Sequence, residues 1–506
     1  MMTTRPCSTW KCIPASLLLS LPAWGHGFAQ RYDLPVPLWL YLSGAGAAVL
    51  LSFVVLLWIL GRRHDRRRWR YNLLPLLPAW LPSLFVLVLR LLGVVLLLLV
   101  LASGFWGPAS PFKNAAPVLV WVLGWVGLAY LSGLVGNLWP LLNPWRSLFM
   151  AVERLGRRPW PGLLDYPSWL GHWPAVLLFW GFVWLELIWP GSDRPLSLAL
   201  VLLGYSLLSW AGMALFGREL WLGRGEVFTQ VFGYLARFAP LAAGTQGTGP
   251  CRLCGALADS HDCPACLERA EPGQRRLWLR PFGSGLLVED GLSPSQVVLV
   301  LSMLASVTFD GLLATPLWQQ LGQGLLGALA PFWLWLKVQG RDPLLWMTSL
   351  VMALFALGFA GLFGLCAWLM ARGVKGWRLA AVASRFVLTL IPIALAYHLA
   401  HYLSYLLIVG QYAIPILSDP FALGWDLFGG SLYLVDIAII NARTLWWLSV
   451  LAIVVAHVMA VYLAHVLALR LFRGRRELLA SQLPLLVLMV AYTVTSLWIL
   501  AQPIVE

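Results

Sequence analysis

The chain has 506 residues, of which 60% are hydrophobic and only 11% are charged, and it contains 30 tryptophans. This composition excludes an ordinary soluble globular protein. The formal net charge of +14 does not indicate nucleic-acid binding, because the cations gather in a few segments beside apolar runs, as the positive-inside rule predicts for membrane proteins.

The first 25 residues have the pattern of a secretory signal peptide. Arg5 and Lys11 precede the short apolar stretch IPASLLLSLP, and small residues end the segment at Gly25. This is the order of regions that a signal peptidase reads. Cleavage after Gly25 would make His26 the amino-terminal residue, where its amine and ring could together chelate copper.

The rest of the chain contains about ten apolar segments that are each long enough for a helix to cross ~30 Å of hydrocarbon. The expected spans are residues 38–60, 78–103, 116–138, 172–190, 195–216, 294–314, 344–370, 384–409, 445–470 and 483–502. The alternating short strands of an outer-membrane barrel are absent from the sequence. We therefore predict an all-α fold, a polytopic transmembrane helical bundle, with membrane helices in 26–216 and 294–506 and a long connection at 217–293.

The orientation of the bundle follows from its basic segments. The stretch GRRHDRRRWR, residues 61–70, contains six arginines and is expected in the cytoplasm. Alternation of the spans then places the basic segments NPWRSLFMAVERLGRRP, ARGVKGWR and LRLFRGRRE on the same side, together with the 217–293 connection. Both ends of the mature chain are expected outside.

Four of the seven cysteines lie in the 217–293 connection, as two CxxC pairs. They are Cys251, Cys254, Cys263 and Cys266. Two such knuckles can arrange four thiolates tetrahedrally around Zn²⁺, and a cytoplasmic location keeps the thiols reduced. Because four cysteines leave no open coordination position, we predict a structural zinc site and not a catalytic one.

Five ionisable residues interrupt the apolar spans: Glu186, Asp310, His398, His401 and His457. Counting along the predicted spans places all five in the outer half of the membrane. Ionisable residues at such depths usually mark functional sites. Taken singly, each histidine could instead make one interhelical hydrogen bond.

Two of these histidines, His398 and His401, are three residues apart and share a helix face. Together with His457 on the next span they could hold one divalent ion, for which imidazole is a common ligand and a carboxylate such as Asp310 adds the negative charge. Zinc and copper are the expected ions. Haem ligated by facing histidines is an open alternative.

Several longer stretches resemble a known family. They are HGFAQRYDLPVPLWLYLSGAGAAVLLSFVVL, LWPLLNPWRSLF, VTFDGLLATPLW and YHLAHY. Together they resemble the polytopic bacterial membrane proteins called fenitrothion hydrolases, over nearly the whole mature chain, although the cysteine-bearing connection is not part of that pattern. The resemblance implies a hydrolase of small apolar organophosphorus triesters in the bacterial inner membrane, with its site facing the periplasm, and it assigns no catalytic residues.

Residues and resemblance combine into one hypothesis. A divalent ion lowers the pKa of bound water to about 7 and can so supply the attacking hydroxide. His398, His401 and His457 would be the metal ligands, with Asp310 as fourth ligand or general base and Glu186 as supporting acid or base. The alternatives are a metal-ion or proton-coupled transporter and a copper- or haem-binding membrane subunit. Membrane lipid is an expected partner, and a homo-oligomer remains open.

Overall fold

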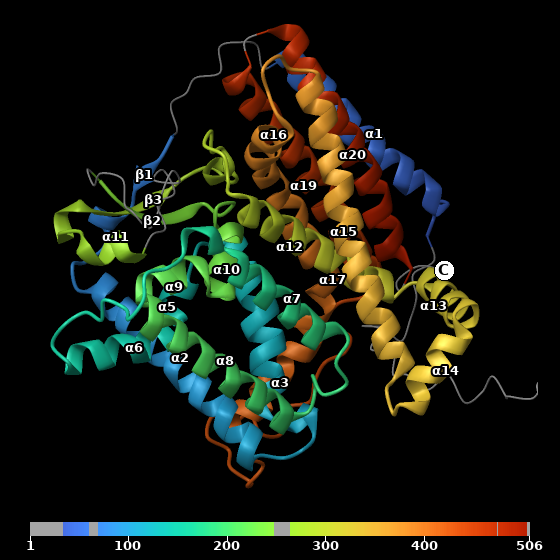
Figure 1. Ribbon diagram of the computed structural model, residues 1–506. Coiled ribbons are helices and arrows are strands. Elements are labelled where there is room, and N and C mark those ends of the chain that lie inside the picture. The colour runs from blue at the N-terminus through green and yellow to red at the C-terminus, as the bar shows by residue number, and fades with distance from the viewer. Residues whose placement is uncertain (1–33, 60–68, 247–263, 473, 503–506) are drawn as a thin grey trace, which may run out of the picture.

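The computed structural model describes residues 34–59, 69–246, 264–472 and 474–502. Ten helical segments in these ranges are long and apolar enough to cross a membrane, which confirms the predicted number. They are Leu38–Ile59, Trp80–Trp106, Ala115–Leu134, Ser168–Leu187, Pro195–Phe216, Pro294–Leu313, Pro343–Arg372, Leu379–Ser418, Ala442–Leu471 and Arg476–Ala501. The chain is a helical multi-pass membrane protein (Figure 1). The expected signal peptide over 1–25, with His26, lies outside the described residues.

The N-terminal half contains five of the spans. Its helices are α1 (Leu38–Ile59), α2 (Leu81–Trp106), α3 (Ala115–Pro117), the π-helix η4 (Val118–Gly127), α4 (Leu128–Leu134), α5 (Trp139–Leu142), α6 (Pro144–Leu155), α7 (Trp173–Leu187) and α8 (Pro195–Phe216). The third span is therefore composite, since η4 lies between α3 and α4.

The described residues of the 217–293 connection form short helices and two strands of a small sheet, which the all-α prediction did not include. It contains α9 (Arg218–Arg224), α10 (Val227–Ala236), β2 (Leu241–Thr245), α11 (Pro264–Arg269) and β3 (Arg275–Leu279). The strand β3 pairs antiparallel with β2 on one side and with β1 (Tyr71–Asn72) on the other, giving the order β1-β3-β2. In Figure 1 this small sheet lies on the opposite side of the molecule from α13 and α14 (Pro316–Ala328 and Ala330–Val338).

The C-terminal half contains the other five spans. Its remaining helices are α12 (Pro294–Leu313), α15 (Pro343–Arg372), α16 (Leu379–Phe386), η9 (Val387–Leu390), α17 (Ile391–Val409), η10 (Gly410–Tyr412), α18 (Ala413–Ser418), α19 (Ala442–Leu471) and α20 (Arg475–Ala501). Local sequence explains where several begin. Proline occupies the first turn of α8, α12 and α15, where a missing N–H leaves no hydrogen bond unmade.

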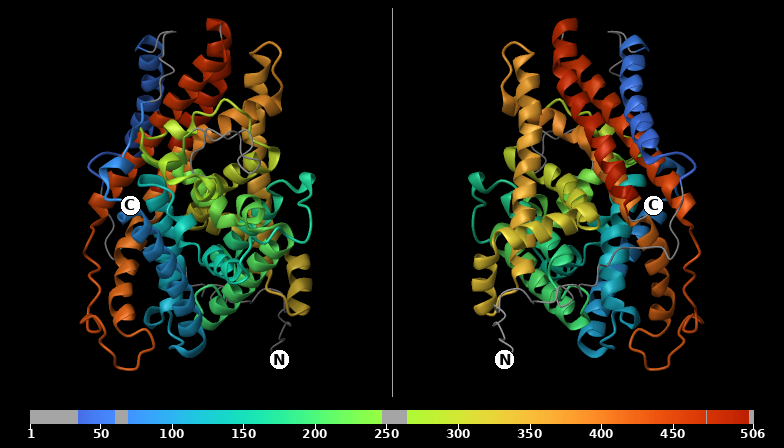
Figure 2. Two further views of the ribbon diagram at one scale, coloured as in Figure 1. Left: turned by 90° about the vertical axis from the view of Figure 1, so that its left-hand side faces the viewer. Right: turned by 90° about the vertical axis from the view of Figure 1, so that its right-hand side faces the viewer.

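The helix α17 lies at the centre of the bundle and packs against α12, α19 and η4. Almost every side chain in its first half is buried, as expected for a helix that is apolar on all faces and surrounded by other helices. The first span also joins this half: α1 packs along α19 and α20, although the rest of the chain separates them in sequence (Figure 2).

The short helix α10 is inserted among the spans and contacts α4, α7 and α17. The buried carboxylate of Glu226 holds its start, accepting hydrogen bonds from the backbone N–H groups of Phe228 and Thr229 at 3.1 and 2.7 Å. The indole of Trp139 and the hydroxyl of Tyr205 donate to the same carboxylate at 3.1 and 2.5 Å. This capping satisfies two of the free N–H donors of the first turn and fixes α10 inside the bundle.

Candidate functional site

Three spans bring ionisable side chains together near the middle of the molecule. Glu186 comes from the end of α7, Asp310 from the end of α12, and His401 and Tyr402 from α17. Nε2 of His401 lies 3.0 Å from Oδ2 of Asp310. The hydroxyl of Tyr402 donates to the same Asp310 oxygen and lies 3.5 Å from Oε1 of Glu186. These four residues are called the intramembrane cluster below.

The cluster borders a cavity between the helices. Asp310, Glu186, Tyr402 and His398 line it, together with apolar side chains such as Trp125. The volume that the centre of a water molecule can occupy is about 30 Å³, which is room for about two water molecules. The cavity therefore combines two carboxyl groups, an imidazole and a phenol with space for water.

His398 belongs to this cavity and not to the ion pair. Its ring packs edge-on against the rings of Trp125 and Tyr130, with centroids 5.5 and 5.7 Å away. Its side chain is 8% exposed, and its Nε2 has no hydrogen-bond partner among the described residues. Buried polar atoms are nearly always paired with protein or with water, so this nitrogen is available to a molecule in the cavity.

His457 does not join the other two histidines. Its Nδ1 lies 2.8 Å from the carbonyl oxygen of Ile453, one turn earlier in α19, and its ring lies 5.9 Å from that of Tyr492. Within the part of the chain that the structure describes, no three His, Cys, Asp or Glu side chains are arranged to hold a metal ion. The described residues therefore do not show the predicted three-histidine ligand set, and their geometry gives the predicted metal ion no support.

The prediction from sequence found Glu186, Asp310, His398 and His401 but missed Tyr402. That residue follows His398 by four positions, so it lies on the same helix face and could have been recognised by spacing. Its phenol connects the two carboxyl groups and is 6% exposed.

No spacing pattern in the sequence indicated Trp125, because this residue lies in the π-helix η4. A π-helix has more residues per turn than an α-helix, so the faces predicted from α-helical spacing do not apply to it. The structure places Trp125 in the cavity wall, 5.5 Å from His398.

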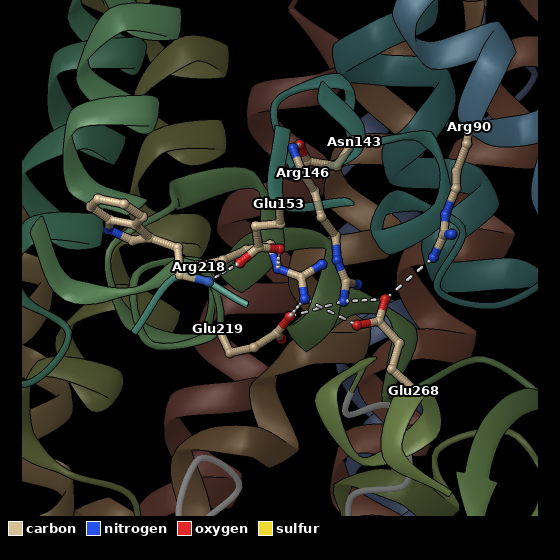
Figure 3. Close-up of polar contacts among 8 residues, drawn as sticks. Arg90, Asn143, Arg146, Glu153, Arg218, Glu219 and Glu268 are labelled. Carbon is tan, nitrogen blue, oxygen red and sulfur yellow. Dashed lines mark hydrogen bonds and ion pairs between the residues drawn. The ribbon is translucent and has the colours of Figure 1, made fainter. Parts of the chain in front are cut away.

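The predicted zinc site falls mostly outside the described residues, which exclude Cys251, Cys254 and Cys263. Cys266 lies in α11, two positions before Glu268. Glu268 accepts from three arginines: Arg146 at 2.8 Å, Arg90 at 3.3 Å and Arg218 at 3.3 Å (Figure 3).

Two further carboxylates complete this arginine–glutamate network. Glu219 lies 3.1 Å from both Arg146 and Arg218, and Glu153 lies 3.3 Å from Arg218. The network lies beyond the end of α8 that is remote from Glu186, and the 22 residues of α8 span about 33 Å. It joins α2, α6, α9 and α11, so it is a structural contact and not part of the cavity.

Comparison of the chain with protein-family models, with curated proteins and with solved structures finds no significant match.

Proposed function

We propose that the chain is a multi-pass membrane hydrolase of apolar organophosphorus triesters such as fenitrothion, acting at the intramembrane cluster. The observation that carries the proposal is that Asp310, held by His401 and Tyr402, faces a cavity of water size beside a second carboxyl group. The resemblance described above supplies the substrate class. In this proposal the protein resides in the bacterial inner membrane with its cluster toward the periplasm, as the basic segments favour.

Asp310 is the base in this scheme. A carboxylate oxygen only accepts, so Nε2 of His401 carries a hydrogen toward Asp310. Tyr402 has one proton to offer two carboxyl groups, and its shorter contact is with Asp310. An ionised Asp310, which accepts from His401 and Tyr402, and a protonated Glu186, which can donate toward the Tyr402 oxygen, are the assignment that fits these contacts. Separate acid and base forms of two neighbouring carboxyl groups are a common basis for hydrolysis.

The chemical step then follows from these positions. A cavity water bonds through its oxygen to phosphorus, and one of its protons passes to Asp310. The bond from phosphorus to the aryl oxygen breaks, and the aryl alcohol leaves with the proton of Glu186. Nε2 of His398 can either donate or accept a hydrogen bond, and it can so orient the water or the phosphoryl group. Positioned acid–base catalysis of this kind typically contributes about 10²–10⁴-fold in rate.

No step of this scheme is assigned to a metal ion. The histidines that were expected to bind one are divided between the cavity, the pair with Asp310 and the backbone of α19. Zinc or copper at His398, His401 and His457 stays a prediction, as does zinc at the four cysteines.

The cavity volume favours a second candidate, a proton-coupled transporter. Room for about two waters is far less than a phosphotriester needs, so hydrolysis requires the helices around the cavity to move apart. Proton transfer through the cluster requires no such opening. Intramembrane carboxyl and histidine groups are typical of proton-coupled transport.

Hydrolysis is tested by nitrophenol release from fenitrothion by the purified full-length protein in detergent. We expect Asp310→Asn and His401→Gln to lose at least about 10²-fold in kcat, because the base and its orienting partner are changed. The matched control is Asp193→Asn, a carboxylate in the turn between α7 and α8 that does not line the cavity. Equal turnover in Asp310→Asn and wild type would exclude this site, and absence of turnover in wild type would favour the transporter.

A further inference from the structure

A second group of buried polar rings continues inward from the intramembrane cluster. It consists of Tyr397 on α17, Tyr492 on α20 and His457 on α19. The ring of Tyr397 lies 6.4 Å from that of His401 and 6.4 Å from that of Tyr492. The ring of Tyr492 lies 5.9 Å from that of His457. The proposed hydrolysis does not use these three residues.

The surroundings of His457 make its ring a proton acceptor. Its Nδ1 lies 2.8 Å from the Ile453 carbonyl oxygen, which can only accept, so Nδ1 carries the hydrogen and Nε2 of the neutral ring holds a lone pair. The side chain is fully buried, and Nε2 has no partner among the described residues. A buried lone pair of this kind is costly unless a water or a proton meets it.

Tyr397 has an equally isolated hydroxyl. The side chain is fully buried, and its Oη has no hydrogen-bond partner within the described part of the chain. The Oη packs against Gly311, the neighbour of Asp310, so closely that a Cβ on that glycine would lie 2.5 Å away. Tyr397 thus places a free donor beside the backbone that carries Asp310.

Tyr492 connects the two. Its hydroxyl is hydrogen-bonded to Thr308 Oγ1, and Thr308 donates its own proton to the Leu304 carbonyl at 2.6 Å. Tyr492 is therefore the donor toward Thr308, and its oxygen lone pairs remain available to accept. A donor at Tyr397, an acceptor at Tyr492 and a base at His457 follow one another inward, and the Tyr492 hydroxyl has to rotate from Thr308 toward His457 to pass a proton on.

We propose that Tyr397, Tyr492 and His457 form a proton relay between the Asp310–His401 pair and the middle of α19. A proton leaves the Asp310 oxygen and bonds to the Tyr397 hydroxyl, which releases its own proton to Tyr492, and Tyr492 in turn releases its proton to Nε2 of His457, with water bridging each gap. Release from Nε2 continues inward toward His465, so that the path leads across the membrane. His465 follows two helical turns later in α19, and its Nδ1 lies 2.8 Å from Gln482 Oε1. The relay rests on the proton-handling role proposed for Asp310 and His401.

The relay is tested by proton flux into phospholipid vesicles that contain the purified full-length protein. A pH-sensitive dye inside reports the flux when a potassium diffusion potential is applied. We expect a flux above that of protein-free vesicles, reduced at least about tenfold in each of Tyr397→Phe, Tyr492→Phe and His457→Gln. His172→Gln, a histidine at the opposite end of α7 from Glu186, is the control and should match wild type. Tyr397→Phe and Tyr492→Phe keep their rings and so preserve the packing.

Two outcomes would overturn the relay: a wild-type flux no greater than that of protein-free vesicles, or unchanged flux in all three variants. Fenitrothion turnover is measured on the same preparations. Proton flux without fenitrothion turnover would contradict the proposed hydrolase and support the relay. Fenitrothion turnover without proton flux would support the hydrolase and contradict the relay.

Discussion

The guanidinium of Arg146 lies 2.8 Å from the carboxylate of Glu268 and is only 3% exposed. This contact joins the cysteine-bearing helix α11 to α6 in the N-terminal half. Because Glu268 also accepts from Arg90 and Arg218, one carboxylate holds arginines from three different helices (Figure 3).

Glu268→Gln should lower stability without changing the intramembrane cluster. The neutral amide loses the charge-assisted hydrogen bonds to a buried arginine, which are worth about 1.5–3 kcal/mol, but Arg146 keeps Glu219. We expect a fall in Tm of several degrees in detergent. Glu271→Gln, three residues later and exposed, is the matched control. An unchanged Tm in Glu268→Gln would show that the network contributes nothing.

Tyr402→Phe should reduce fenitrothion turnover while the protein remains folded. The change removes one hydroxyl and keeps the ring that packs against His398 and His401. Loss of a hydrogen bond to a charged group costs about 1.5–3 kcal/mol, which corresponds to roughly 10–100-fold in kcat. The control is Tyr412→Phe in η10, whose ring contacts Phe112 and does not line the cavity. Wild-type kcat in Tyr402→Phe would remove this phenol from the mechanism.

Gly311→Ala should destabilise the junction between α12, α17 and α20. The new Cβ would lie 2.5 Å from Tyr397 Oη and 2.8 Å from Ile499 Cγ2, so these buried side chains or the helices that carry them must shift. Overpacking of this kind costs about 1–3 kcal/mol. Gly324→Ala in α13 is the opposite case, because nothing lies within 4 Å of its Cβ position. Gly324→Ala should be neutral or should stabilise the protein by up to about 1 kcal/mol, because alanine has the higher helix propensity. Thermal unfolding of the Gly311→Ala and Gly324→Ala variants measures the difference.

Replacing Cys251, Cys254, Cys263 and Cys266 with serine should remove bound zinc and leave turnover unchanged. The four thiolates are expected to occupy every coordination position, so the ion has no site for substrate. Elemental analysis of the purified protein measures the metal, and nitrophenol release measures the activity. Zinc that persists in the quadruple variant would place the ion elsewhere, and lost turnover in a folded variant would contradict a purely structural role.

Much of the fold was predictable because its signals are local. Ten apolar runs of sufficient length predict ten spans, and the described residues contain ten helical segments that are long and apolar enough to cross a membrane. The π-helix η4 and the inserted helix α10 were not predictable in this way. The place of α10 depends on residues distant in sequence, because the carboxylate of Glu226 at its start accepts from Trp139 and Tyr205 of other helices.

The candidate site was predicted in part. The rarity of charged residues in apolar spans identified Glu186, Asp310, His398 and His401. In the structure His398 lines the cavity, whereas His401 pairs with Asp310. The spacing of residues within one helix does not predict how a neighbouring helix is rotated about its own axis. His457 lies on a span that packs along α17, yet its ring turns toward Tyr492 and its Nδ1 toward Ile453.

By itself, then, the sequence established a helical chain that crosses a membrane about ten times, and it identified the ionisable groups that have to be accommodated there. Only the tertiary structure decided which of those groups meet. Hydrophobic length is a property of each segment alone, whereas the pairing of His401 with Asp310 and the separation of His457 depend on how helices rotate and pack against one another.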